Sequence, residues 1–424
     1  MKKVLIVCLF IMMVSLTICF YANGVNAAEE KITLRYATWC VMEEGTGGFF
    51  RSMAEKYEEQ TPSVKIEFLG YPYGDITQQI LIMANAGDAP DVVQTEPNNY
   101  NTYLGSMFVE PLDNLLGKEY IEDIYPSVKS ALTYNGKIYA VPFISCPYVL
   151  VYNKELFKEA GLDPDNPPKT YQEMISYAEK LAKLKDANGN SVYGLGLTTA
   201  SVPVSGNSVL TTMINFGGGI YNKAGKIDVV NKGNIEAFEF YKRLYEKKLN
   251  PESAKLKDLR NLMAIGRLGM YFDQTWGTAG VCAINPDIKE KLMLAPMPAT
   301  NETDGVSLLQ SHLLLIMKDS KHKEEAAKFV KYLTSKETLT EYYEKSSPFL
   351  SGRMSVNASA DFGDDFIEPI KNSLNSIITL AKMDPNMANA YLEISAAVQR
   401  ATIGEETPKA ALQKLDVSLK RILK

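Results

Sequence analysis

The stretch "YFDQTWGTAG", residues 271–280, ends an apolar run with a tryptophan set among glycines and hydroxyls. The chain has only two tryptophans, and the other, Trp39, closes the alternating segment "ITLRYATW" near the start. A flat aromatic face offers apolar area to the C–H face of a sugar ring, while nearby polar groups bind its hydroxyls. Trp276 lies beside Gly277, Thr278 and Gly280, which favours this chemistry over the alternative of a half-buried core residue.

Acidic and polar side chains also follow predicted strands. Glu43 and Glu44 come after the first strand in a glycine-rich turn, where ligand contact and compensation of a helix dipole are equally good interpretations. Asp273 is expected to accept hydrogen bonds from two hydroxyls, each worth ~1.5–3 kcal/mol. Gln310 and His312 begin a later strand, although a lone histidine is more often structural. Further candidates are Gln94, Thr95 and Glu96, which follow "DVV", and Tyr148, which lies beside a proline-rich β-segment.

Several other chemistries do not fit the sequence. The only histidines, His312 and His322, do not lie in a metal-ligand spacing, so zinc is not expected. The chain lacks a phosphate-binding G-x-x-x-x-G-K-[ST] loop, and the "GGG" at 217–219 follows Phe216 in a turn rather than a strand. It also lacks a G-x-S-x-G nucleophile motif. We therefore expect no metal and no cofactor.

The elements that must position these residues form two α/β units. Apolar alternation in "ITLRYATW" and "VKIEFL", with a helical repeat between them, predicts strand–helix–strand order and a parallel sheet. The β-run "NGKIYAVPFISCPYVLVYN" carries Pro142 and Pro147, which suits edge or crossover strands. A second set of helices and strands follows, with Thr170 as the expected cap of its first helix. Near the end, "SHLLLIMK" and "HKEEAAKFVKYL" predict one more strand and helix.

The N-terminus predicts export. Lys2 and Lys3 precede an apolar stretch, and the small residues of "GVNAAEE" offer a cleavage site after Ala27. The alternatives are an uncleaved membrane anchor and a lipid on Cys19, for which Ile18 is a poor preceding residue. Hydrophobic residues make up 46% and charged residues 22% of the chain, as in ordinary globular proteins. The net charge of −5 and the lack of a basic tract argue against a nucleic-acid partner.

An ordered series of motifs then resembles one known family. These are "MANAGDAPDVV", "GKIYAVPF", "VLVYNKELFKEAGLDPDNPPKTYQEM", "YGLGL", "GRLGMYFDQTW", "SKHKEEAAKFVKYLTS", "SSPFLSGR" and "IGEETPKAALQKL". Each is weak alone, but their order across the chain resembles the family 1 extracellular solute-binding proteins. That family, to which maltose-binding protein belongs, supplies the sugar-binding receptors of ABC importers.

The resemblance implies two α/β lobes of the periplasmic-binding-protein type, joined by a hinge and closing on ligand in the cleft between them. It assigns residues 28–143 and 290–346 to the N-terminal lobe, and 144–289 and 347–424 to the C-terminal lobe, after a signal peptide at 1–27. It makes Trp276 a sugar-stacking residue and Tyr391 a second one, with a helix-face tyrosine as the equal alternative. The stretch matching 94–96 contacts sugar in the family. The implied partners are an oligosaccharide or disaccharide and the membrane permease subunits of an ABC importer. The receptor itself is expected to be a monomer at the outer face of the membrane or in the periplasm.

Two alternatives to a sugar receptor stay open. A secreted glycosidase also combines paired carboxylates with tryptophans, and Glu43 with Asp273 would be its candidate pair. A receptor for another solute, such as a polyol phosphate or a peptide, is the third hypothesis. Phosphate would favour arginine or lysine at the strand ends, whereas these ends are aromatic and acidic, which favours neutral sugars.

Overall fold

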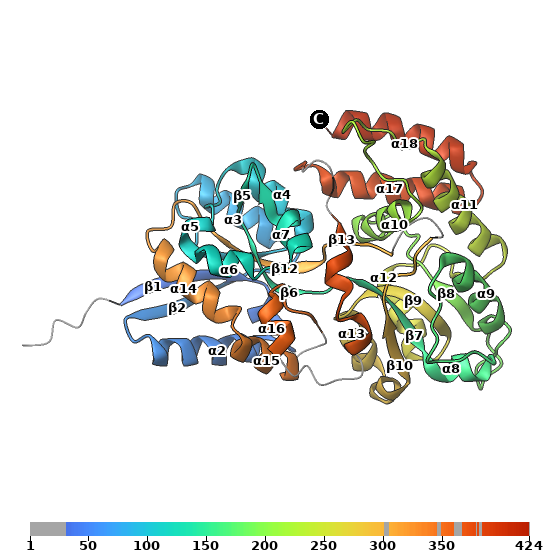
Figure 1. Ribbon diagram of the computed structural model, residues 1–424, viewed down its shortest axis with the longest axis horizontal. Coiled ribbons are helices and arrows are strands. Elements are labelled where there is room, and N and C mark those ends of the chain that lie inside the picture. Colours follow the sequence, from blue (N-terminus) through green and yellow to red (C-terminus); the bar gives the residue numbers. More distant parts are fainter. Residues whose placement is uncertain are drawn as a thin grey trace, which may run out of the picture.

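The computed structural model describes residues 31–300, 305–345, 349–359, 367–378, 380 and 384–423. The expected signal peptide and Cys19 lie outside these residues. Figure 1 shows two α/β lobes side by side, each built on its own sheet. Within the described part of the chain, no helix combines the length and apolar character needed to cross a bilayer.

The first lobe contains a five-stranded sheet in the order β2-β1-β3-β12-β6. β1 pairs in parallel with β2 and β3, whereas β12 runs antiparallel to both β3 and β6. The strands are β1 (Ile32–Thr38), β2 (Val64–Gly70), β3 (Val92–Thr95), β6 (Val141–Ser145) and β12 (Ser311–Ile316). The helices of this lobe are α2 (Gly47–Gln60), α3 (Ile76–Asn85), α4 (Pro97–Ser106), α5 (Asp113–Leu116), α6 (Lys118–Glu122), α7 (Pro126–Leu132), α14 (Lys323–Leu333), α15 (Lys336–Lys345) and α16 (Met354–Ser359). The expected strand–helix–strand start of the chain is confirmed.

The second lobe contains a four-stranded sheet in the order β10-β7-β9-β8. β7 runs antiparallel to β9 and β10, and β8 is parallel to β9. The strands are β7 (Tyr148–Asn153), β8 (Tyr193–Gly196), β9 (Leu268–Gln274) and β10 (Leu292–Ala295). The helices are α8 (Lys154–Glu159), α9 (Tyr171–Leu181), α10 (Pro203–Asn215), α11 (Lys232–Glu246), α12 (Leu256–Ala264), α13 (Gly277–Ile284), α17 (Met387–Thr402) and α18 (Pro408–Ile422). Thr170 caps α9 in a capping box with Glu173, as its sequence position predicts.

Short elements connect these layers. They are the 3-10 helices η1 (Cys40–Met42), η2 (Pro286–Lys291), η3 (Glu368–Ile370) and η4 (Ser373–Ser376), the β4 (Thr133–Tyr134) and β5 (Lys137–Ile138) hairpin, and the parallel pair β11 (Ser307–Leu308) and β13 (Ile377–Ile378).

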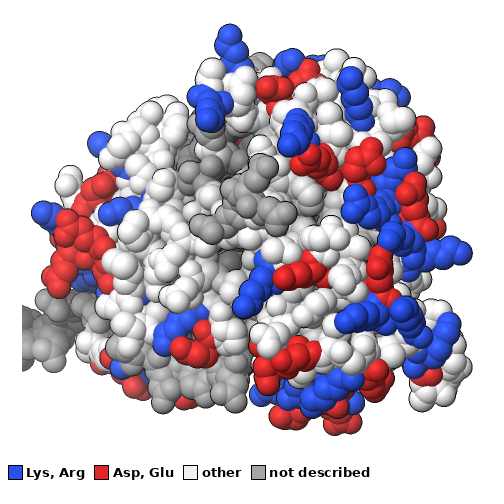
Figure 2. Space-filling model, turned by 45° about the vertical axis from the view of Figure 1, so that its right-hand side comes forward, with Lys and Arg blue, Asp and Glu red and all other residues white. Residues whose placement is uncertain are grey.

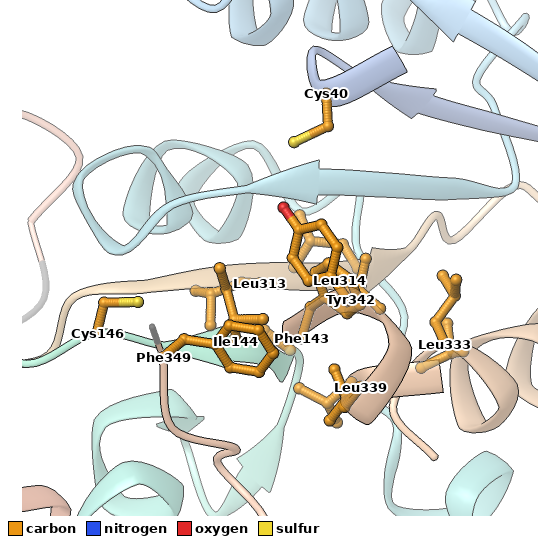
Figure 3. Packing of buried hydrophobic residues seen from close by; sticks show 14 of the residues in the cluster. Cys40, Phe143, Ile144, Cys146, Leu313, Leu314, Leu333, Leu339, Tyr342 and Phe349 are labelled. Atoms are coloured by element: carbon orange, nitrogen blue, oxygen red, sulfur yellow. The ribbon is translucent and has the colours of Figure 1, made fainter. Parts of the chain in front are cut away.

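The core of the first lobe is rich in aromatic rings. Figure 3 shows Phe143 on β6 and Tyr342 on α15 packed close to β12, which carries Leu313 and Leu314. Tyr342 stacks on Phe143 with ring centroids 5.3 Å apart, and all four side chains are buried. Aromatic pairs of this kind add to the free energy gained by burying their area. This packing fixes β6 and β12, the strands that lead toward the second lobe.

The chain crosses between the lobes directly after β6. β6 lies at the edge of the first sheet and tolerates Pro142 there, because an edge strand has no ladder partner on its outer side. Cys146 and Pro147 then lead into β7 of the second sheet. A second crossing, near β11, runs beside the first: the Cys146 amide donates to the Gln310 carbonyl (2.8 Å) and the Tyr148 amide to Ser307 Oγ (3.0 Å). The predicted crossover at the prolines is present.

The structure places two segments differently from the expected lobe limits. β10 belongs to the second sheet because Leu292 and Leu294 pair with β7, so the chain leaves this lobe later than residue 290. Residues 349–359 contact the first lobe, whereas η3 contacts β10 of the second lobe. Arg353 forms an ion pair with Asp123 (Nε–Oδ2, 2.8 Å), and Phe349 packs in the first-lobe core.

Candidate ligand-binding site

A cavity of about 420 Å³ lies between the two lobes. The ends of β1 and β3 reach it from the first lobe, and the start of β12 lies beside them because β12 runs antiparallel to β3. The end of β9 and the start of β7 meet at it from the second lobe in the same way. Clefts at the carboxyl ends of strands are the usual ligand sites of α/β sheets. The lining residues are Trp39, Glu43, Thr46, Tyr73, Glu96, Asn98, Ile144, Tyr148, Val204, Asn207, Leu256, Arg260, Gln274, Trp276, Gln310, His312 and Tyr342.

Both tryptophans of the chain line this cavity, one from each lobe. Trp39 is 4% exposed and meets the rings of Tyr73 (5.5 Å) and His312 (5.0 Å) edge-on. Trp276 is half-buried, and its ring lies 5.0 Å from His312 at an interplanar angle of 35°. It precedes α13, where the chain turns after β9. The cavity therefore has aromatic surface on both lobes, joined through His312.

A buried hydrogen-bond chain orients His312. Thr38 Oγ1 donates to Gln94 Oε1, and Gln94 Nε2 lies 3.0 Å from His312 Nδ1. With the Gln94 amide in this orientation, His312 Nδ1 accepts a hydrogen bond from Gln94 Nε2, and His312 Nε2 carries the ring proton. Burial lowers the pKa of His312 to about 3, so the ring is neutral at physiological pH. A neutral ring with a fixed donor can bind an acceptor on a ligand.

Two carboxylates stand on the first-lobe side of the cavity. Glu96 follows β3, and its Oε2 accepts a hydrogen bond from the Tyr73 hydroxyl (2.7 Å). Burial raises the pKa of Glu96 to about 7, and the charge of Glu43 adds to that rise. The pKa of Glu43 itself is also raised by burial, in spite of a long hydrogen bond from Thr46 (3.4 Å).

An arginine–aspartate pair stands on the second-lobe side. Arg260 of α12 lines the cavity and donates to both oxygens of Asp273, from Nε (2.7 Å) and Nη2 (2.8 Å). Asp273 is fully buried and also accepts from the Gln274 amide (2.8 Å). A side chain at Gly277 would meet Asp273 Oδ2 at 2.0 Å, so the glycine after Trp276 makes room for this carboxylate.

Amide side chains complete the wall and bridge the lobes. Asn207 on α10 accepts from Gln310 Nε2 (3.1 Å), and its own amide approaches Asn98 Oδ1 of α4 (3.4 Å). Gln274 is 5% exposed, and its Oε1 has no hydrogen-bond partner among the described residues. Buried polar atoms are nearly always hydrogen-bonded, so an orphaned acceptor beside a cavity indicates a ligand or water partner.

Six residues expected from the sequence line the cavity: Trp39, Glu43, Glu96, Tyr148, Trp276 and Gln310. Four do not. Gln94 and Thr95 are buried within β3, and Gln94 reaches the cavity only through His312. Asp273 was expected to accept hydroxyls directly, but its oxygens bind Arg260 instead. Tyr391 lines a neighbouring cavity of about 70 Å³ that also contacts Asn207.

Sequence reasoning missed Tyr73, Asn98, Asn207, Arg260 and Gln274. Arg260 and Asn207 project from helices rather than from strand ends, and nothing in their local sequence distinguishes them. Asn98 follows Glu96 closely and could have been found by extending the strand-end rule into the next turn. Among the described residues, no group of three or more His, Cys, Asp or Glu side chains is arranged to hold a metal ion.

Two α/β lobes, paired crossovers and a lined cavity between the lobes define a solute-binding protein of the periplasmic type. The chain belongs to the bacterial extracellular solute-binding proteins, whose family model matches residues 43–339, more than half of its length. It is 23% identical over 347 residues to the arabinooligosaccharide-binding protein of Bacillus subtilis, covering 80% of this chain and 77% of that protein. The structure is similar to an ABC transporter solute-binding protein of Thermotoga lettingae bound with α-D-tagatose (TM-score 0.79, 23% identity, 93% of this chain and all of the other). It is also similar to the cyclic α-maltosyl-1,6-maltose binding protein of Arthrobacter globiformis (TM-score 0.80, 18% identity, covering 93% and 99%).

Proposed function

We propose that the protein captures a carbohydrate in the interlobe cavity and delivers it to the membrane permease of an ABC importer. The observation that carries this proposal is the meeting of both tryptophans of the chain, Trp39 and Trp276, in one cavity that also contains carboxylate, amide and hydroxyl side chains. Apolar faces with a few convergent polar groups are what sugar rings require. The family membership and the arabinooligosaccharide-binding relative support the same solute class.

The size of the cavity supports a small carbohydrate. Its volume of about 420 Å³ falls in the lower part of the range of ~300–1,000 Å³ typical of ligand pockets. A neighbouring cavity of about 70 Å³ beside Tyr391 shares Asn207 with it. A disaccharide or short oligosaccharide is therefore the proposed ligand.

The alternatives are less well supported. The glycosidase hypothesis needs Glu43 and Asp273 as a carboxylate pair facing the substrate, but Asp273 is buried beneath Arg260. We therefore propose a binding protein without catalytic activity. A phosphate ligand needs free cationic donors, and Arg260, the one cation among the described residues that line the cavity, is already paired.

We also propose that the protein acts outside the cytoplasm as a monomer, after cleavage near Ala28. Lysine, arginine, aspartate and glutamate side chains alternate over the face shown in Figure 2, which is consistent with a solvated surface rather than a nucleic-acid interface. Intact-mass analysis of the protein from its host tests the processing. A diacylglycerol adduct on an N-terminal Cys19 would overturn cleavage at Ala28.

A thermal-shift screen of mono-, di- and oligosaccharides tests the function. A ligand that binds only the folded protein stabilises it by ~2.7 kcal/mol at 100 times its dissociation constant, which raises the melting temperature measurably. We expect at least one carbohydrate to do so. Stabilisation by phosphorylated polyols or peptides alone would contradict the proposal.

A further inference from the structure

The charges that line the interlobe cavity do not balance. The lining includes two carboxylates, Glu43 and Glu96, and one cation, Arg260. Both oxygens of Asp273 bind the Arg260 guanidinium, so this pair contributes no net charge. His312 is neutral, and no lysine among the described residues lines the cavity. The excess charge of the cavity is therefore negative and lies on the first-lobe side, on Glu43 and on the ionised fraction of Glu96, whose pKa of about 7 leaves it partly protonated near neutral pH.

Neither carboxylate has a cationic partner among the described residues. Glu96 accepts one hydrogen bond, from the Tyr73 hydroxyl, and Glu43 accepts a long one from Thr46. The charge of Glu43 makes ionisation of Glu96 harder, which shows that the two groups act on one another. Glu96 is partly buried, and a carboxylate in that position is normally paired, because removing an unpaired charge from water is costly. Glu43 is exposed and is solvated by water, so it is Glu96 that lacks an expected cationic partner among the described residues.

One further polar atom favours a ligand that donates hydrogen bonds. Gln274 lines the cavity from the second lobe, and its buried Oε1 is an acceptor that lacks a hydrogen-bond partner among the described residues. Trp39 and Tyr73 add aromatic rings, whose faces attract cations. A group with several N–H donors and a positive charge satisfies these features together, whereas a hydroxyl supplies one donor and no charge.

From this charge balance, we propose that the carbohydrate captured in the cavity is an amino sugar, whose protonated amino group binds to Glu43 and Glu96. The inference rests on the proposed carbohydrate-binding function and narrows its ligand class. The amine supplies the missing positive charge, and its three N–H donors reach the free carboxylate oxygens. The rest of the sugar lies against the tryptophans, as it would for a neutral sugar.

Matched ligand triplets test this inference by isothermal titration calorimetry. Each triplet keeps one sugar skeleton and changes one substituent on each ring: glucose, glucosamine and N-acetylglucosamine; galactose, galactosamine and N-acetylgalactosamine; cellobiose, its diamino analogue chitobiose, and N,N′-diacetylchitobiose. In at least one triplet the amine should bind about tenfold or more tightly than both relatives, as expected for a charge-assisted hydrogen bond. Added salt should reduce that preference.

Two variants locate the preference, and a third is the matched control. Glu96→Gln and Glu43→Gln keep the shape of the side chain and remove its charge, so each should lower the amine-to-neutral affinity ratio severalfold. Glu44→Gln makes the same change at the residue after Glu43, which is exposed and does not line the cavity. It should leave the ratio unchanged. Circular dichroism confirms that each variant is folded.

The outcomes separate the inference from the proposed function. Neutral sugars that bind as tightly as their amines, or more tightly, would overturn the inference and leave the carbohydrate receptor intact. An amine preference that survives in both Glu43→Gln and Glu96→Gln would also overturn it. If no sugar of any triplet or of the wider carbohydrate screen binds, the proposed function fails and the inference fails with it.

Discussion

At the scale of single residues, Asp273 is an example of a residue whose position could be predicted from the sequence but whose role could not. Its place beside Trp276 at the end of β9 was visible in the sequence, but the structure turns its carboxylate onto Arg260. A fully buried carboxylate needs a charged partner, and a bidentate guanidinium is the best one available. The aspartate thus positions the arginine, which lines the cavity.

Removing the Asp273 carboxylate, the partner of Arg260, should destabilise the protein. Asp273→Ala leaves the Arg260 guanidinium partly buried and unpaired, and we expect the free energy of unfolding to fall by ~2–4 kcal/mol. This loss of stability is toward the lower end of what breaking a buried ion pair costs, because a quarter of the Arg260 side chain is exposed. Urea denaturation measures it. Asp88→Ala, which breaks the exposed pair with Arg35, is the control and should have a much smaller effect on stability, because solvent screens that pair.

Equal losses of stability in these two variants would show that burial of Asp273 has no energetic consequence. That result would remove our reason for treating the aspartate as the residue that positions Arg260.

Glu96 predicts an unusual dependence of stability on pH. Its pKa is raised from 4.5 to about 7 in the folded protein, so between these values the folded state holds a proton that the unfolded chain has lost. In that window the free energy of unfolding therefore decreases as pH rises. Glu96→Gln removes this term, and the stability of the variant relative to the wild type should increase by ~1–3 kcal/mol from pH 4.5 to 7.5.

Urea denaturation of both proteins at several pH values measures that difference. His312 titrates in the opposite sense, because its lowered pKa makes stability rise with pH between about 3 and 6.5, but it is common to both proteins and cancels. A difference that does not change with pH would show that Glu96 titrates normally.

At the scale of elements, the sequence was informative wherever apolar periodicity and turn chemistry agreed. The alternation of β1 and β2 and the capping box at Thr170 are local signals, and both are present in the structure. The lobe that receives an element is not a local signal. β10 pairs with β7 across more than 130 residues of sequence, and only this pairing shows that it belongs to the second lobe.

The residues of the candidate site also divide into those that have a local signal in the sequence and those that do not. Residues at strand ends, such as Trp276 and Glu96, could be found because strands end at the cleft. Arg260 and Asn207 could not, since their helices reach the cavity through tertiary packing alone. The packing that brings Asn207 into place is the contact of α10 with α17, where Gly206 lies against the Tyr391 backbone.

Gly206 should therefore be required at this helix crossing. A Cβ atom there would lie 1.8 Å from the Tyr391 carbonyl oxygen, so Gly206→Ala must push the helices apart. We expect a loss of ~1–3 kcal/mol in the free energy of unfolding, despite the better helix propensity of alanine. Gly48→Ala in α2, where a Cβ meets no atom within 4 Å, is the matched control and should be neutral or slightly stabilising. Equal effects in a denaturation curve would contradict this account of the crossing.

At the scale of the whole molecule, the crossovers and the cavity together predict a hinge. The connection after β6 and the strand β11 run side by side between the lobes, and the lobes also meet across the cleft, for example where Asn207 approaches Asn98. Ligand that touches both lobes should stabilise the closed arrangement. Small-angle scattering should show a smaller radius of gyration at saturation with a stabilising sugar. An unchanged radius would argue against hinge closure.

The central claim is that sugar binds between Trp39 and Trp276, and the tryptophan emission of the protein tests it most directly. These are the only tryptophans in the chain and both line the cavity, so a sugar in the cavity must change their surroundings. We expect a saturable change in emission with any sugar that raises the melting temperature. In Trp276→Ala, affinity should fall about 30-fold or more, as for a truncated aromatic hot spot, with little loss of stability. A stabilising sugar that leaves the emission unchanged, or that binds Trp276→Ala as tightly as the wild type, would place the binding site elsewhere and contradict the account.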